Sequence, residues 1–141
     1  MRDPSDMAIV NTFPKCLDSP YLFQDADAPK RIGPLLATAG DRLEAAANIQ
    51  NTGQGDPADV CFLSYEAMFS CLRALVYAKG YREAGLRCLM LACEHLYVRP
   101  GALDVEHIHA FERMQGLKVA PADSLAAASS FVKRTLELLG Q

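Results

Sequence analysis

With 141 residues, of which half are hydrophobic and 22% are charged, the chain is long enough to bury a core and too apolar to be intrinsically disordered. Its formal net charge of −3 gives no overall basic field of the kind that draws nucleic acid to a surface, although a local basic face stays open. We therefore expect one globular domain.

Residues 1–31 are predicted to form an irregular, extended N-terminal arm. Proline lacks a backbone N–H and clashes with the preceding helical turn, so its frequent recurrence argues against a helix. Two short apolar patches, residues 7–10 and 21–23, would allow the arm to pack against a neighbouring surface. The prolines of this arm are Pro4, Pro14, Pro20 and Pro29.

A helical pattern begins at Ile32, and the apolar residues that follow recur on one face of a 3.6-residue helix. Residues 51–55 break this pattern. Asp56 and Pro57 then form a favourable N-cap and first helical position for a second helix over residues 57–79. That helix is apolar on several faces, which places it in the middle of a bundle, and Gly80 supplies its left-handed C-cap.

Three further helices are expected. The third covers residues 81–98, and the fourth starts near Asp104. The fifth covers residues 125–139 after a break at Pro121. No strand is predicted, and short connections favour antiparallel neighbours. The sequence therefore predicts an all-α, up-and-down bundle of four to five helices over residues 32–141.

The five cysteines show no metal-site pattern. Their number is odd, no CxxC occurs, and no cysteine or histidine group has zinc-ligand spacing, so we expect no metal and no cofactor. We interpret them as small buried hydrophobic side chains in a reducing compartment. The cysteines are Cys16, Cys61, Cys71, Cys88 and Cys93.

The location expected from the sequence is the cytoplasm. No apolar run approaches the ~18 residues that a membrane span needs. The first four residues, Met-Arg-Asp-Pro, are charged, and no apolar signal-peptide region follows them. We therefore predict a cytoplasmic protein that does not enter a membrane.

One stretch resembles a known family. Residues 64–82 combine a tyrosine, a Met-Phe pair, an Arg-Ala-Leu run and a Gly-Tyr turn, and residues 126–132 form a last helix rich in small residues. This arrangement is similar to the central hairpin and last helix of HEPN domains. The likeness covers about residues 32–140 in the order of its elements, and residues 60–97 are its specific part.

The resemblance implies an up-and-down bundle that commonly forms a homodimer. It also implies one of two roles. Many members are ribonucleases of toxin–antitoxin, phage-defence and CRISPR systems, while others accompany a nucleotidyltransferase or bind nucleotides. Active members carry an Arg followed four to six residues later by a His. In this chain no histidine follows an arginine at that distance; the histidines are His95, His107 and His109.

Two groups of cations are candidates for binding RNA or a nucleotide. Arg113 and Lys118, with His109 one turn before Arg113 on the same helical face, could form a phosphate-binding patch or a solvated face. Arg73 and Arg82 make the second-to-third helix hairpin locally basic, although such residues also form i, i+4 pairs, of which Glu83 with Arg87 is one candidate.

The leading hypothesis is a non-catalytic, homodimeric HEPN-like protein that binds a nucleotidyltransferase-type partner protein, RNA or a nucleotide. The alternative is a metal-independent ribonuclease that uses Arg113 with His109 or with a histidine from the other subunit. The arginine would hold a phosphate and the histidine would act as base or acid. A purely structural bundle without a nucleic-acid role is the third reading.

Overall fold

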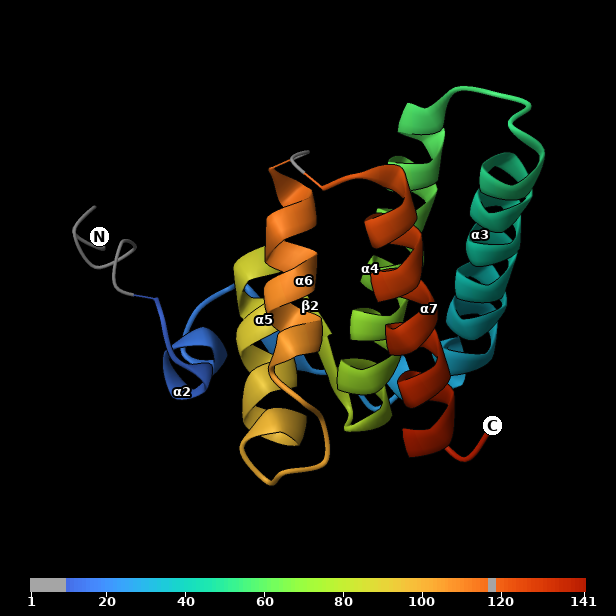
Figure 1. Ribbon diagram of the computed structural model, residues 1–141. Coiled ribbons are helices and arrows are strands. Elements are labelled where there is room, and N and C mark those ends of the chain that lie inside the picture. Colours follow the sequence, from blue (N-terminus) through green and yellow to red (C-terminus); the bar gives the residue numbers. More distant parts are fainter. Residues whose placement is uncertain (1–9, 117–118) are drawn as a thin grey trace.

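The computed structural model describes residues 10–116 and 119–141 as a helical bundle with one small sheet (Figure 1). The predicted all-α class is confirmed. In chain order the elements are α2 (Phe13–Leu17), β1 (Leu22–Gln24), the 3-10 helix η1 (Ala28–Arg31), α3 (Ile32–Thr52), α4 (Pro57–Ala78), β2 (Tyr81–Glu83), α5 (Leu86–Cys93), the π-helix η2 (Glu94–Val98), α6 (Glu106–Gln115) and α7 (Pro121–Leu138).

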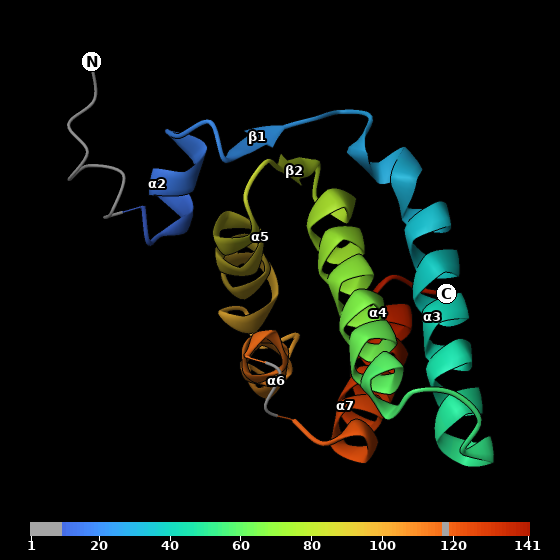
Figure 2. The same cartoon turned by 90° about the horizontal axis from the view of Figure 1, so that it is seen from above.

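Helix α4 occupies the centre of the bundle, with α3 on one side, α7 on another and α5 and α6 on a third (Figure 2). Its buried residues include Met68, Leu72 and Leu75, which contribute to a single hydrophobic core. By length and composition α4 could cross a membrane, but 61% of its most apolar 18-residue window is buried inside the protein. This is the pattern of a core helix, as the sequence predicted.

The predicted ends of α3 and α4 are confirmed. Helix α3 begins at Ile32 and ends before Gly53, whose φ of 69° is left-handed. Asp56 caps α4 because its side-chain Oδ1 accepts a hydrogen bond from Ala58 N at 2.9 Å. After α4 the chain turns at Gly80, whose φ of 83° favours glycine.

The expectation that the N-terminal arm contains no helix and the chain no strand is wrong. Helix α2 forms because Pro14 lies in its first turn, where a missing N–H costs nothing, and Thr12 Oγ1 accepts a hydrogen bond from Lys15 N at 3.3 Å. Strand β1 pairs antiparallel with β2, with Phe23 opposite Arg82. The part of the first apolar patch at residues 7–9 lies outside the described residues.

The reading of all five cysteines as unpaired is also wrong. A disulfide joins Cys16 of α2 to Cys88 of α5, with a Cα–Cα distance of 5.7 Å, and holds the arm against the bundle. Cys71 and Cys93 are free and buried, as expected, and desolvation by burial raises the pKa of each thiol to about 12. The third free cysteine, Cys61, is half-buried.

Residues 81–98 do not form one continuous helix as predicted. Pairing with β1 extends residues 81–83 into β2, so that α5 starts only at Leu86. Beyond α5 the chain widens into η2, where Arg99 N donates to Glu94 O at 3.0 Å. The predicted Glu83–Arg87 pair is absent, because Arg87 Nε instead donates to Val10 O at 3.1 Å.

Candidate functional site

A cavity of about 460 Å³ lies where η1, α3, α4 and β2 meet, and we call it the cationic pocket. Four of its lining residues carry a positive charge and one a negative charge, in a chain whose net charge is −3. The charged residues are Lys30, Arg31, Arg73, Arg82 and Glu83, and the remaining lining residues are Pro34, Leu35, Thr38 and Tyr77.

The β1–β2 ladder creates this pocket from parts of the chain that are distant in sequence. Lys30 and Arg31 belong to η1, at the end of the arm, while Arg73 lies on α4 and Arg82 on β2. Asp25 N donates to Gly80 O at 2.8 Å immediately after β1, which holds the arm against the turn that follows α4. The structure therefore brings the two predicted residues Arg73 and Arg82 to one cavity and adds two cations that the sequence reading left out.

Glu83 fixes the position of Arg73. The carboxylate accepts from Arg73 Nε at 3.0 Å and from the Tyr77 hydroxyl, and its side chain is only 6% exposed. Burial, followed by the bond to Glu83, raises the pKa of Tyr77 to about 12, so the hydroxyl keeps its proton and donates. The Arg73 guanidinium also lies 4.3 Å from the ring centre of Phe69.

The other three cations are held less firmly. Arg82 Nη1 lies 3.7 Å from Asp25 Oδ2, and Lys30 Nζ lies 2.9 Å from Asp27 Oδ1 in an exposed pair. Within the described residues Arg31 contacts no carboxylate. These side chains can turn toward an anion at a low cost in free energy, because exposed ion pairs contribute little to the stability of the fold.

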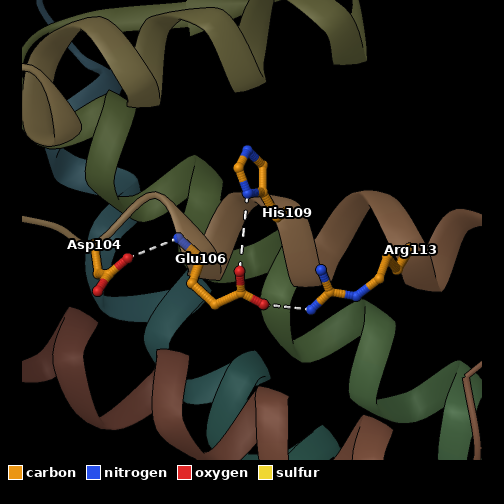
Figure 3. A network of polar contacts seen from close by, with 4 residues as sticks. All are labelled: Asp104, Glu106, His109 and Arg113. Atoms are coloured by element: carbon orange, nitrogen blue, oxygen red, sulfur yellow. Dashed lines mark hydrogen bonds and ion pairs between the residues drawn. The ribbon is translucent and has the colours of Figure 1, made fainter.

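The second predicted site, on α6, has a different character (Figure 3). His109 and Arg113 share one helical face, as predicted, and both point at the carboxylate of Glu106. Arg113 Nη2 lies 2.5 Å from Glu106 Oε1 and His109 Nδ1 lies 3.8 Å from Oε2; Asp104 Oδ1 accepts from the backbone N of Glu106 at 2.9 Å.

This arrangement neutralises Arg113 rather than presenting it to a ligand. The hydrogen bond from Arg113 and its charge hold the pKa of Glu106 below its usual value, so the carboxylate stays ionised and competes with any phosphate. Arg113 and His109 lie on exposed positions of α6, apart from the cationic pocket. Lys118, the third member predicted for this group, lies outside the described residues.

A third site, which the sequence reading missed, joins η2 to the arm. His95 Nδ1 lies 3.3 Å from Arg99 Nη1, and the His95 ring stacks on Phe13 with centroids 4.3 Å apart. A cavity of about 290 Å³ is lined by these three residues. The i, i+4 spacing of His95 and Arg99 is a signal in the sequence, although the histidine precedes the arginine and so reverses the order of the Arg-to-His motif.

The model of the HEPN domain family matches residues 34–111, more than half of the chain. The protein belongs to the HEPN family. The match supports the resemblance drawn from residues 64–82. It covers α4, β2 and α5 completely and α3 except for its first two residues. No curated protein and no solved structure gives a significant match.

Within this HEPN domain the matched range contains Arg73 and Arg82 but begins after Lys30 and Arg31 and ends before Arg113. Half of the cations of the cationic pocket are therefore contributed by sequence outside the family match. Among the described residues no group of three or more His, Cys, Asp or Glu side chains is arranged to hold a metal ion.

Proposed function

We propose that this HEPN protein is a non-catalytic binding protein that holds the phosphate groups of a nucleotide or an RNA in the cationic pocket. The observation that carries the proposal is the gathering of Lys30, Arg31, Arg73 and Arg82 around one cavity of a chain with net negative charge. Asp25 and Asp27 offset part of this charge from outside the lining.

The chemistry of these side chains supports phosphate as the ligand. An arginine presents several N–H donors in one plane, which match the oxygens of a phosphate better than a point charge does. In Arg73 the bond to Glu83 uses Nε and leaves both terminal nitrogens for a ligand. An arginine fixed in this way loses little side-chain entropy on binding.

We test this with the full chain, titrating it with inorganic tripolyphosphate and with a single-stranded RNA of about 10 nucleotides. Arg82→Gln is expected to weaken both about tenfold, since bonds to charged groups contribute 1.5–3 kcal/mol. Lys133→Gln, an equal charge change at an exposed position of α7, is the matched control. Equal losses in both variants, or affinities that do not fall as salt rises, would refute a specific phosphate site.

We further propose that the protein forms a homodimer. If its ligand is not a nucleic acid, we propose a nucleotidyltransferase-type protein as its partner. Phe62 supports a protein contact, because 58% of its surface is exposed although it lies on α4, the central helix of the bundle. Light scattering of wild type and Phe62→Ser tests this. A wild-type monomer at tens of micromolar would contradict the dimer.

The second candidate function is a metal-independent ribonuclease based on His109 and Arg113. It is favoured by one observation, the convergence of a candidate base and a phosphate-holding side chain on one exposed face of α6. RNA cleavage by wild type that disappears in Arg113→Ala would establish it and overturn the non-catalytic proposal. Cleavage that persists in Arg113→Ala comes from another site or a contaminant.

A further inference from the structure

A second cavity continues the cationic pocket along the groove between α3 and α4. Its volume is about 300 Å³, and it shares Thr38 and Arg73 with the cationic pocket. Each cavity alone falls at the small end of the range for ligand pockets. We call the second one the aromatic compartment, and its lining residues are Thr38, Tyr65, Glu66, Phe69, Ser70 and Arg73.

The aromatic rings of this compartment are held in place from behind. Tyr65 stacks on Phe111 with ring centroids 4.7 Å apart and an interplanar angle of 11°, and Phe69 packs edge-on against the same ring at 6.1 Å. Phe111 is fully buried, whereas Tyr65 and Phe69 are half-buried. The Arg73 guanidinium lies over the Phe69 ring, 4.3 Å from its centre, so the preorganised ring that the groove offers to a flat apolar group is Tyr65.

The polar groups at the two ends of the compartment differ in charge. Glu66 Oε2 accepts from Arg42 Nε at 3.1 Å, and within the described residues Oε1 has no hydrogen-bond donor. Arg73 forms the opposite end and lines both cavities. A ligand that fills both cavities needs anionic groups at one end and a flat ring bearing a hydrogen-bond donor at the other.

From this arrangement we infer that the groove takes a nucleoside polyphosphate, with its phosphates in the cationic pocket and its base in the aromatic compartment. This inference rests on the proposed function and adds the base to it. The Arg73 guanidinium contacts the phosphate nearest the sugar, and Glu66 Oε1 accepts from an exocyclic amine of the base. Stacking on Tyr65 supplies affinity that a phosphate chain alone does not have.

The test compares ligands on the full wild-type chain by titration calorimetry. Adenosine triphosphate is expected to bind about tenfold or more tightly than inorganic tripolyphosphate, because a stacked base contributes that much or more. Purine riboside triphosphate, which keeps the purine ring but lacks the exocyclic amine, is expected to bind more weakly than adenosine triphosphate. Equal affinity for the two nucleotides would overturn the role of Glu66.

Two variants test whether the base binds in the aromatic compartment. Tyr65→Leu is expected to remove most of the advantage of adenosine triphosphate over tripolyphosphate, whereas Phe23→Leu, at an exposed ring on β1 that lines neither cavity, is expected to leave it unchanged. NMR contacts between the base protons and the Tyr65 ring provide the same information in wild type. Loss of the advantage in both variants, or in neither, would place the base elsewhere.

The outcomes distinguish a failure of this inference from a failure of the proposed function on which it rests. If tripolyphosphate binds and adenosine triphosphate binds no more tightly, the base compartment is wrong and the phosphate site stands. If neither ligand binds, the proposed function fails and the inference fails with it.

Discussion

Arg73 Nε donates to Glu83 Oε2 at 3.0 Å, and this pair connects the end of α4 to β2. The two exposures differ sharply: the Glu83 side chain is 6% exposed and the Arg73 side chain 42%. The carboxylate therefore depends on its partners far more than the guanidinium does, since a buried charge without a partner is costly.

Replacing Arg73 is expected to destabilise the fold as well as weaken phosphate binding. In Arg73→Met the buried carboxylate keeps only Tyr77 as a partner, and we expect the free energy of unfolding to fall by about 1.5–3 kcal/mol. Arg82→Met removes a looser pair at 3.7 Å and is expected to cost less than about 1 kcal/mol. Urea denaturation measures both, and equal costs would contradict the role assigned to Glu83.

The Cys16–Cys88 bond is expected to be a large contributor to stability. It closes a loop of 72 residues, for which the chain-entropy model gives about 4 kcal/mol. Reductant should therefore lower the urea midpoint of wild type markedly. The double variant Cys16→Ala, Cys88→Ala is the control, and its midpoint should not respond to reductant. An unchanged wild-type midpoint would show that the bond does not stabilise the fold.

The compartment of the protein is expected to set the state of this bond. Disulfides persist in oxidising compartments and are rare in the cytosol, whereas the sequence predicts a cytoplasmic protein. Mass spectrometry of protein alkylated in intact cells, without reductant, measures the state directly. A cytoplasmic protein should carry both alkylated cysteines, and an intact bond would favour an oxidising location.

Native thiol reactivity is expected to be confined to Cys61. Only the thiolate reacts, and burial raises the pKa of Cys71 and of Cys93 to about 12, so both stay protonated near neutral pH. An alkylating reagent should modify one cysteine in the native protein, three after unfolding without reductant, and all five after unfolding with reductant. Rapid native labelling of Cys71 or Cys93 would mean that the core opens locally.

Acid is expected to destabilise the protein through His107. Burial beside Phe131, the largest cause, and the charge of Arg134 lower the pKa of His107 from its ordinary 6.5, against the opposing effect of Asp104 and Glu106. The folded state thus binds fewer protons than the unfolded state. Its stability is complete above the unfolded pKa and is lost as pH falls from there through the folded pKa.

Urea titrations of wild type and of a His107 variant between about pH 8 and about pH 5.5 test this. His107→Phe preserves a ring for stacking on Phe131 and removes the titrating group. Its loss of stability over this range should be smaller than that of wild type. Identical pH dependence would exclude His107 as a source.

Local signals in the sequence were sufficient for α3 and α4, but not for the start of α7, which lies at Pro121 rather than at residue 125 as predicted. The α3 start at Ile32, the Asp56 cap and the turn at Gly80 each depend on neighbouring residues only, and all three were predicted correctly. The strands β1 and β2 were not predicted, because three residues each are too few to show alternation, and their pairing joins segments about 60 residues apart.

The same distinction between local and long-range signals applies to the candidate sites. The shared face of His109 and Arg113 was readable from i, i+4 spacing, and Glu106, three residues before His109, could have been found in the same way. The cationic pocket was not readable as a unit. Arg31 meets Arg82 there only because the arm pairs with β2, and no pattern around Arg31 indicates that pairing.

The pairing of β1 with β2 has a practical consequence for anyone who trims this protein. A recombinant fragment cut at the family limits, residues 34–111, would discard β1, the Cys16 half of the disulfide and two of the four pocket cations, and also α7 with its buried Phe131. Such a fragment would expose β2 as an unprotected edge and the core as an open face, so an expressed fragment should begin upstream of Cys16 and extend through α7.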